Sequence, residues 1–522
     1  MVDPLEDQLN TEERRVLPEL RPWVWPFLTD YQREGICRAV GRGDFHLWWP
    51  CGSGKTLAAV VWAVATPHPV VVVTRASARR QWASEFRRFA EVEPYVFLPK
   101  SDRRKDTPSL REYLDDCTNR NLRPIVIAGW PSLAMTEDAG LNPELDEFVR
   151  GVVEFSIVWD ESHVAKDHRR WRRLAKADGG HRYEKRTTTA AVAGFLAPRA
   201  ARRLALTATP MPDRTRDLWA QLTLVEPHGT WEKYWAWAQT YCDAYEDMYG
   251  WDDKGSSNPD QLRAVLGARV HIVPTDRVSA KLPPMRRTVT WLPREVLGRS
   301  SKEANAAVKQ AAKEAKGSDE GVERLFQTRL EQSASRKTKH VVETVADCLR
   351  AGQKVLVFTG LRKDVGTLHD AILSALQKAK VADYKLWAAH GGSPPDERET
   401  IRDDYMAHQG AACIVGTGAA WGESVNLQDT DRLVVVMLPW TWGQIRQWEG
   451  RVRRLGGRSC LVEYLVAEGT VDERVSSIVL EKLAAVEDVL PDSQVAGVRE
   501  TLQGGTDDAL IDGLLDRFME DE

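Results

Sequence analysis

The sequence lacks any apolar segment long enough to cross a bilayer. Its longest apolar runs, Val70–Val73 and Leu433–Leu438, are far shorter than the roughly 18 residues that a spanning helix needs. The N-terminus also lacks a basic stretch followed by an apolar one, so no secretory signal is visible. These absences predict a cytoplasmic protein (in the host cytoplasm if the chain is viral) without a membrane partner.

Cysteine is scarce, and its seven positions follow no pattern. No two cysteines have the spacing of zinc ligands or of a redox pair, which favours reduced thiols over a disulfide framework. Tandem repeats are also absent. The chain does contain 43% hydrophobic and 28% charged residues, a balance typical of globular proteins with buried cores, which excludes disorder of the whole chain.

Neither sign of charge dominates, because the 522 residues sum to a net charge of −4. The distribution is nevertheless uneven. Residues 484–522 hold eleven acidic and two basic residues, whereas residues 166–188 hold nine basic and three acidic ones. The basic segment is either a phosphate-gripping loop or a solvated one, and the acidic tail is a possible site for a protein partner.

Short β-branched runs alternate with helical patterns in two parts of the chain. Five strands are expected before residue 215: Phe45–Trp49, Val70–Thr74, Pro124–Trp130, Phe155–Asp160 and Arg203–Thr207. Five more are expected after residue 350: Lys354–Thr359, Tyr384–Ala388, Ala412–Thr417, Arg432–Leu438 and Cys460–Val466. Apolar strands separated by helices are typical of parallel sheets covered on both faces. The fold class predicted is therefore α/β, with two parallel-sheet domains.

The stretch between these two parts is rich in aromatic residues at helical spacing, such as Trp219, Tyr234, Trp237 and Tyr241. We favour internal packing of these rings over stacking on nucleobases. The predicted organisation is an N-terminal extension (1–24), a first α/β domain (25–215), a helical insertion and linker (216–335), a second α/β domain (336–480) and an acidic tail (481–522).

A phosphate-binding loop follows the first expected strand. Glycines let backbone N–H groups turn toward phosphate oxygens, and the helix N-terminus that follows adds partial positive charge. Lys55 would reach the β- and γ-phosphates, and the Thr56 hydroxyl would bind Mg²⁺. The motif predicts ATP and Mg²⁺ as cofactors, bound by Gly52, Ser53, Gly54, Lys55 and Thr56.

Two adjacent carboxylates stand at the end of a later strand. Asp160 could hold Mg²⁺ there, and Glu161 could orient and deprotonate the attacking water. A solvated turn is the commoner origin of such a pair. Its position at a strand end, about 105 residues after Lys55, favours a hydrolytic ATP site.

Two further segments could complete this site. Thr207 and Thr209 follow another expected strand and could pass the state of the nucleotide to the next domain, although a capped turn is the simpler interpretation in isolation. Arg451 and Arg454 are three residues apart, so on a helix they would share one face. Directed at a γ-phosphate, such arginines are worth about 10³–10⁵ in rate, and the alternative is a solvated or nucleic-acid-binding face.

The order of these motifs resembles that of the helicase superfamily-two ATPases, most closely their Swi/Snf-like branch, over about residues 25–480. The resemblance implies two RecA-like lobes with a nucleotide cleft between them. It implies that Gln32 reads adenine and that Gln447 acts with Arg451 and Arg454 in catalysis. The full eight-residue phosphate-loop pattern has a glycine where Trp49 stands, but this superfamily usually lacks that glycine, so the departure is mild. The chain also departs at Arg453, where the branch prefers histidine.

The resemblance also implies a nucleic-acid partner, with double-stranded DNA expected. The implied contacts lie at Arg75, Ser77, Trp130, Thr359, Gly360 and Thr417. We predict an ATP-dependent DNA helicase or translocase that is not sequence-specific. The alternatives are a motor subunit that acts only within a larger nucleoprotein complex, an RNA helicase, and a metabolic P-loop kinase. The paired arginines and the second α/β domain argue against the kinase, and the oligomeric state stays open.

Overall fold

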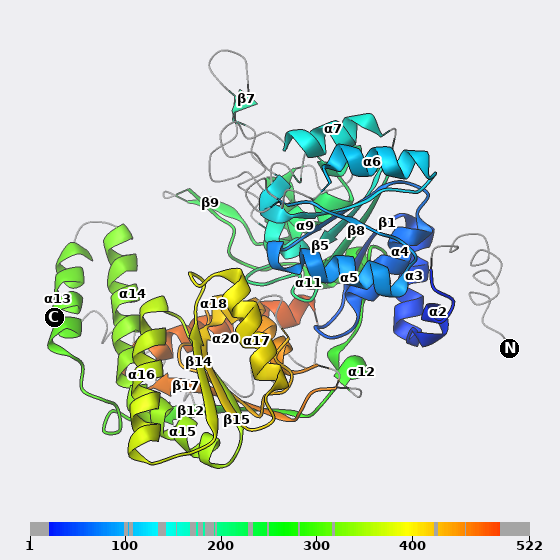
Figure 1. The fold of residues 1–522 in the computed structure, drawn as a ribbon. Coiled ribbons are helices and arrows are strands. Elements are labelled where there is room, and N and C mark those ends of the chain that lie inside the picture. The colour runs from blue at the N-terminus through cyan, green and yellow to red at the C-terminus, as the bar shows by residue number, and fades with distance from the viewer. Residues whose placement is uncertain are drawn as a thin grey trace. The chain divides into compact units, whose positions relative to one another are not determined.

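The computed structural model describes residues 20–98, 103, 108–133, 142–152, 154–166, 174–175, 181–182, 193, 196–227, 233–247, 250–279, 282–315, 319–421, 426–454 and 456–490. The chain forms two compact units that divide after Thr275 (Figure 1). Most of the predicted N-terminal extension, basic segment and acidic tail lies outside the described residues.

The first unit is built on a seven-stranded sheet in the order β11-β1-β8-β5-β2-β4-β3, and every neighbouring pair is parallel. The strands are β1 (Asp44–Trp48), β2 (Val70–Thr74), β3 (Tyr95–Val96), β4 (Ile125–Gly129), β5 (Ser156–Asp160), β8 (Arg202–Thr207) and β11 (Val270–Ile272). All five residues of β2 and of β4 are buried, as expected for central strands of a parallel sheet.

Helices precede, connect and follow these strands along the chain. They are α2 (Val24–Phe27), α3 (Asp30–Arg42), α4 (Lys55–Ala65), α5 (Arg79–Phe89), α6 (Leu110–Asn119), α7 (Pro143–Gly151), α9 (Asp217–Val225), α10 (Tyr234–Tyr241), α11 (Pro259–Gly267) and α12 (Thr275–Ser279), the last of which spans the division between the units. A short hairpin of β9 (Tyr245–Asp247) and β10 (Gly250–Asp252) follows α10. Helix α4 is apolar almost throughout and is buried from Leu57 to Val64, directly after the interior strand β1.

The second unit has a six-stranded sheet in the order β12-β17-β16-β13-β15-β14, again with parallel neighbours only. Its strands are β12 (Met285–Leu292), β13 (Lys354–Thr359), β14 (Tyr384–Ala389), β15 (Ala411–Thr417), β16 (Arg432–Val435) and β17 (Cys460–Ala467). Its helices are α13 (Lys302–Ala315), α14 (Asp319–Arg336), α15 (Thr338–Arg350), α16 (Arg362–Lys378), α17 (Pro395–Ala407), α18 (Gly418–Trp421), α19 (Trp442–Val452) and α20 (Val471–Val489).

All ten strands expected from the sequence are present, with small differences at their ends. The aromatic stretch divides after Thr275: α9 to α11 belong to the first unit, and α13 and α14 belong to the second. Four of its rings are buried and pair within the first unit, since Trp219 and Tyr234 lie 5.2 Å apart and Trp237 and Tyr241 lie 5.4 Å apart. Internal packing is confirmed for these rings.

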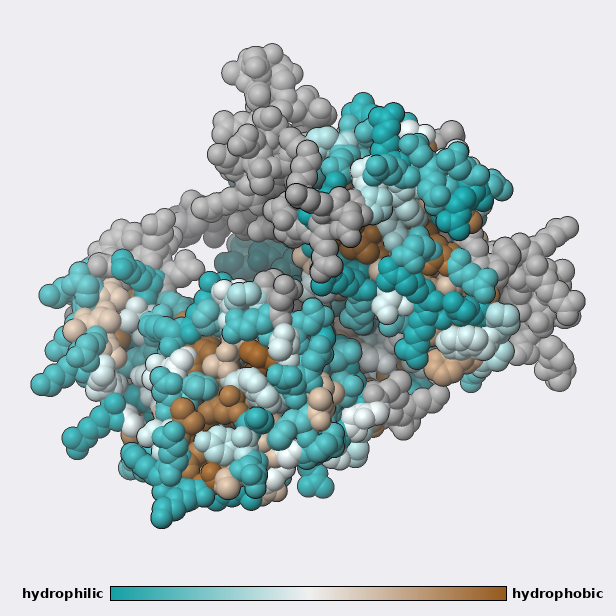
Figure 2. Space-filling model, viewed as in Figure 1, coloured by the Kyte–Doolittle hydropathy of each residue, from teal (hydrophilic) through white to brown (hydrophobic). Residues whose placement is uncertain are grey.

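The face of the molecule in Figure 2 is largely hydrophilic, with apolar residues in scattered patches. This surface is expected when the apolar side chains lie between sheets and helices. No helix among the described residues is long and apolar enough to cross a membrane.

Candidate ATP site and arginine helix

The predicted site residues of the first unit meet at the carboxyl ends of its parallel strands. Adjacent strands β1, β8, β5, β2 and β4 all run in the same direction, so their carboxyl ends lie side by side. The phosphate-binding loop follows β1, and Thr207, Asp160 and Thr74 end the next three strands. This edge is where ligands bind in open α/β sheets.

The phosphate-binding loop requires glycine at two positions. Gly52 and Gly54 have φ angles of 76° and 79°, in the left-handed region that other residues avoid. A Cβ atom at Gly54 would stand 2.3 Å from Nε2 of Gln32. Gly54 therefore lets the chain turn into α4 while Gln32 packs directly against the loop.

Gln32 supports the loop with both ends of its amide group. Its Oε1 accepts a hydrogen bond from the Thr29 backbone N–H at 2.9 Å, which caps α3, and its Nε2 donates to the Ser53 carbonyl at 2.9 Å. The Tyr31 hydroxyl donates to the same carbonyl at 2.9 Å. Adenine recognition by Gln32 stays a prediction.

The loop has the chemistry that a triphosphate needs. The Lys55 ammonium donates to the carbonyls of Trp49 and Pro50, each at 3.0 Å, so it lies folded against the loop. The Ser53 hydroxyl is buried and has no hydrogen-bond partner among the residues that the structure describes. A buried polar atom of this kind fits a site that acquires its partner on ligand binding. Thr56 lies in the first turn of α4, beside the loop.

Trp49, which stands where the full eight-residue pattern has a glycine, points into the interior of the first unit. Its ring is fully buried and its Nε1 donates to Nδ1 of His271 on β11 at 3.0 Å. A Cβ atom at Gly35 of α3 would stand 2.3 Å from the Trp49 ring, so the helix approaches this ring closely. The Trp49 side chain therefore joins the start of the loop to the edge strand β11.

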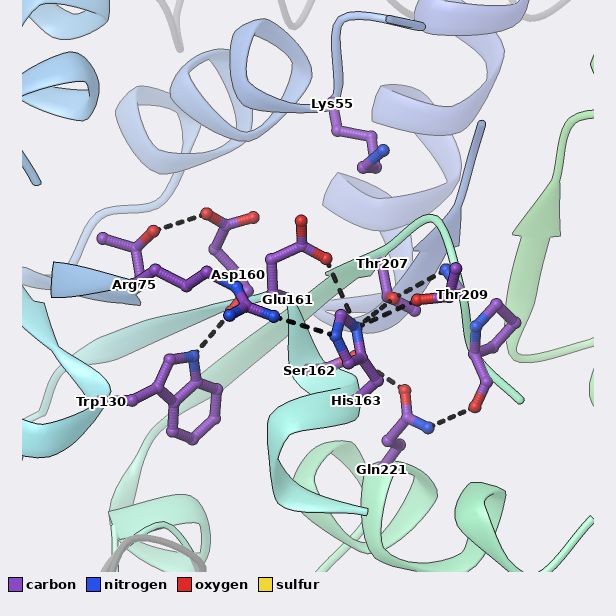
Figure 3. Close-up of polar contacts among 12 residues, drawn as sticks. Lys55, Arg75, Trp130, Asp160, Glu161, Ser162, His163, Thr207, Thr209 and Gln221 are labelled. Atoms are coloured by element: carbon purple, nitrogen blue, oxygen red, sulfur yellow. Dashed lines mark hydrogen bonds and ion pairs between the residues drawn. The ribbon is translucent and has the colours of Figure 1, made fainter. Parts of the chain in front are cut away.

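Asp160 is held by two donors before any ligand binds. Its Oδ2 accepts hydrogen bonds from the Thr74 hydroxyl at 2.6 Å and from the Trp82 indole at 2.8 Å. Burial, and next the negative charge of Glu161, raise the pKa of Asp160 to about 6, while the hydrogen bonds from Thr74 and Trp82 and then the charge of Lys55 oppose this shift. In Figure 3 the carboxyl groups of Asp160 and Glu161 point toward the side on which Lys55 lies.

His163 joins the carboxylate pair to two other segments (Figure 3). Its Nδ1 lies 2.9 Å from the Thr207 hydroxyl, 3.3 Å from the Thr209 hydroxyl and 3.4 Å from a Glu161 carboxylate oxygen. On the other side of the ring, Nε2 lies 3.4 Å from a guanidinium nitrogen of Arg75. Burial lowers the pKa of His163 to about 4, so the ring is neutral at pH 7.

The neutral ring has one N–H group, and its contacts assign the proton. A guanidinium group can only donate, so Nε2 accepts from Arg75 and Nδ1 carries the hydrogen. Nδ1 can then donate to the Thr207 hydroxyl or to Glu161. The predicted coupling residues Thr207 and Thr209 are thus within reach of the predicted water-activating residue through one side chain.

In the second unit, α19 carries Gln447 and Arg451, but Arg454 lies beyond the end of the helix. The helix ends at Val452, and Arg453 has an extended backbone. The Nε atom of Arg454 donates to the Gly450 carbonyl at 3.0 Å, so this side chain caps the helix C-terminus. The expectation that both arginines share one face of a helix is therefore wrong, because the chain leaves the helix ahead of Gly456 and Gly457.

The predicted nucleic-acid residues differ in their exposure. Ser77 and Gly360 are exposed, whereas Thr359 and Thr417 are buried register partners at the ends of β13 and β15. Trp130 is only 3% exposed.

The Trp130 ring stacks on the Trp159 ring at 5.4 Å, and its Nε1 donates to the Asp160 carbonyl at 2.9 Å. The Trp130 ring therefore belongs to the core, and a nucleic-acid contact at this residue stays a prediction.

Sequence reasoning did not assign roles to Thr74, Trp82, Tyr31 and His163 in this site. Each contacts a predicted site residue, and Thr74 and Trp82 both lie far in sequence from the residue they contact, Asp160. The sequence signal that could have found Thr74 is its place at the end of a strand next to the strand of Asp160.

Comparisons with known proteins agree with this architecture. Residues 11–340 match the SNF2-related domain, and residues 336–456 match the helicase conserved C-terminal domain. The SWI/SNF-related matrix-associated actin-dependent regulator of chromatin subfamily A-like protein 1 of Xenopus tropicalis is 26% identical over 467 residues, which cover 87% of this chain and 44% of that protein. The DNA annealing helicase and endonuclease ZRANB3 of Mus musculus is 25% identical over 504 residues, which cover 92% of this chain and 42% of that protein.

This chain thus spans less than half the length of either relative. A solved structure, the ATP-dependent Type ISP restriction-modification enzyme LlaBIII bound to DNA, shares the fold with a TM-score of 0.53 at 13% identity, over 91% of this chain and 33% of that one. The predicted fold class, two RecA-like parallel-sheet lobes, and the resemblance to Swi/Snf-like ATPases are confirmed. Because the SNF2-related domain matches more than half of its residues, the chain belongs to the SNF2-related family.

Proposed function

We propose that this chain is an ATP-driven motor that moves along double-stranded DNA without reading its sequence. The observation that carries the proposal is the set of contacts around His163, which places Glu161 one side chain away from Arg75. A relative that aligns with 92% of the chain is named a DNA annealing helicase, which supports DNA as the polymer.

The phosphate-binding loop and Lys55 would hold the triphosphate of ATP. Lys55 would exchange the carbonyls of Trp49 and Pro50 for the β- and γ-phosphates. Thr56 and Asp160 would hold Mg²⁺, which would neutralise phosphate charge. Because Thr74 and Trp82 both bind Oδ2 of Asp160, they fix the plane of this carboxylate in advance.

Glu161 would orient the attacking water and accept its proton. Its backbone has a φ angle of 52°, which turns the chain sharply after β5. The Nδ1–H group of His163 would hold Glu161 or release it, depending on whether it donates to Glu161 or to Thr207.

Arg75 would connect DNA binding to the hydrogen bond that His163 donates to Glu161 or to Thr207. It stands at the start of the segment after β2, next to exposed Ser77, and is itself only partly buried. A DNA phosphate that draws the guanidinium from Nε2 of His163 would change the hydrogen bonding of the ring and so the position of Glu161. We assign to Arg451 and Arg454 the stabilisation of charge on the γ-phosphate in the transition state, with Gln447 beside them.

The test is the steady-state ATPase rate with linear duplex DNA, single-stranded DNA and RNA of matched length, measured in parallel. We expect the largest stimulation by duplex DNA, and a loss of most of this stimulated turnover in Arg454→Ala with nearly unchanged binding of a nucleotide analogue. Equal rates with and without every polymer would refute the motor. Stimulation by RNA alone would support an RNA helicase instead.

A further inference from the structure

The helix that carries the proposed arginines is anchored by a buried cluster of charges. Glu449 of α19 is 3% exposed, and both of its carboxylate oxygens bind the guanidinium group of Arg287 on β12, at 2.6 and 2.8 Å. The hydroxyl of Tyr464 on β17 donates to the same carboxylate at 2.8 Å. Bidentate pairing fixes orientation as well as distance, so this contact sets how α19 lies on the sheet.

Arg453 adds a second attachment at the end of the helix. Its Nε donates to the carbonyl of Pro283 at 3.3 Å. Burial, and then the positive charge of Arg287, lower the pKa of Arg453, while the charge of Glu449 opposes this change. Arg453 therefore ties the end of α19 to the segment that precedes β12.

The geometry of an α-helix separates this anchor from the proposed catalytic groups. Residues two positions apart point about 200° apart around the helix, so Glu449 and Arg451 face nearly opposite sides. The backbone carbonyl of Arg451 accepts a hydrogen bond from the Leu427 N–H at 3.1 Å, which fixes the same turn from another direction. The face of α19 that carries Glu449 is therefore held against the sheet, whereas the face that carries Arg451 makes separate contacts.

The anchor also reaches the covalent connection between the two units. The first unit ends at Thr275, and residues 276–284 lead to β12. Pro283 is in this connection, and Arg287 is the third residue of β12. The carbonyl of Pro284 accepts from the N–H of Cys460, the first residue of β17. Arg287 and Arg453 thus hold α19 against the point where the connection enters the second sheet.

Resting on the proposed function, we infer that Arg287, Glu449 and Arg453 form a positioning cluster that fixes Arg451 and Arg454 relative to the connection between the units. They touch no reacting atom and act through the two arginines. At position 453, the long arginine side chain reaches the Pro283 carbonyl from the end of α19.

The experiment is a double-mutant cycle on single-turnover ATP hydrolysis, with and without duplex DNA. We expect Arg287→Met to lower the rate constant about tenfold or more, because small displacements of catalytic groups are costly, and to leave the concentration of ATP at half-saturation within about twofold. In the Arg454→Ala background the same change should cost less than about twofold, since its effect passes through the arginines.

The matched control is Arg432→Met, which breaks the ion pair of Arg432 with Glu463 on the same sheet without touching α19. We expect it to lower the melting temperature but not the rate constant. Tyr464→Phe removes a single hydroxyl and should lower the rate in the same direction even if Arg287→Met does not fold. Arg287→Lys keeps the positive charge but loses the pair of N–H groups that bind both Glu449 oxygens. It should therefore have a rate constant between those of Arg287→Met and the wild type.

A full loss of rate from Arg287→Met in the Arg454→Ala background, or an equal loss in Arg432→Met, would overturn the positioning role. A wild-type rate in both Arg287→Met and Tyr464→Phe would overturn it too. If wild-type hydrolysis does not respond to DNA, the proposed motor is refuted, but the cycle on basal hydrolysis still decides the role of the cluster.

Discussion

At the scale of single residues, the site depends on how Asp160 and Glu161 divide their contacts. Asp160 is fixed by hydrogen bonds from Thr74 and Trp82. Glu161 instead lies 3.4 Å from Nδ1 of His163, which can also bond to the Thr207 hydroxyl. Adjacent carboxylates with different surroundings can take different roles, one as ligand and one as base.

We expect Glu161→Gln to bind ATP but to hydrolyse it about 10²–10⁴-fold more slowly, because the amide cannot accept a proton. Lys55→Ala should instead lose hydrolysis together with nucleotide affinity. Fluorescent-nucleotide binding combined with single-turnover hydrolysis separates the two variants. Retention of normal turnover in Glu161→Gln would show that another group takes the proton.

Acid stability should depend on His46, which is buried in β1 without a hydrogen-bond partner among the described residues. Burial, and then the charge of Arg269, lower the pKa of His46 to about 3, from an ordinary value of 6.5. Below pH 6.5, His46 therefore binds a proton in the unfolded chain but not in the folded chain. The free energy of unfolding should fall as the pH drops from about 6.5 to about 3.

We expect His46→Leu to flatten this part of the curve of melting temperature against pH. Phe45→Leu, at another buried position of β1 without a titratable side chain, is the control and should leave the slope unchanged. An acid slope in His46→Leu as steep as in the wild type would contradict this assignment.

At the scale of elements, the loop between β1 and α4 is set by contacts with α3. We expect Gly54→Ala to weaken ATP binding about tenfold, because the left-handed backbone and the approach of Gln32 both oppose a Cβ atom. Gly41→Ala in α3 is the matched control, since nothing lies within 4 Å of its added Cβ, and it should bind ATP normally. Equal ATP affinity in both variants would show that the loop tolerates a side chain.

Elements with a strong local pattern could be predicted, and elements formed by tertiary contacts could not. The central strands are continuous apolar runs, so β2 and β13 agree with the sequence at both ends. Strand β12 begins Met285-Arg286-Arg287 and is mostly half-buried at the sheet edge, so it has no such run. Strand β11 has only three residues and depends on its pairing with β1.

The same distinction applies to the site. The order of motifs predicted which residues end the strands, and parallel pairing brings those ends together. The contact of Trp82 with Asp160 joins residues 78 positions apart, and nothing in their spacing announces it. The end of α19 before Arg454 was missed because the periodicity of the arginines continues past Val452, while the chain itself turns.

At the scale of the whole molecule, each unit carries one part of the proposed chemistry on its own parallel sheet. The first holds the phosphate-binding loop and the carboxylates, and the second holds the arginine helix and its anchor. Neither part is a complete hydrolytic site by the chemistry of phosphoryl transfer, which needs the phosphate cradle and the positive charge together. We therefore expect ATP hydrolysis and movement to require the groups of both units.

The most direct measurement is displacement of a third strand from a DNA triplex, run beside a forked duplex with the same protein. We predict that the wild type displaces the triplex strand only when ATP is present, and that Glu161→Gln displaces none. Failure of the wild type to displace the third strand while it hydrolyses ATP on duplex DNA would contradict the account, as would displacement that needs no ATP.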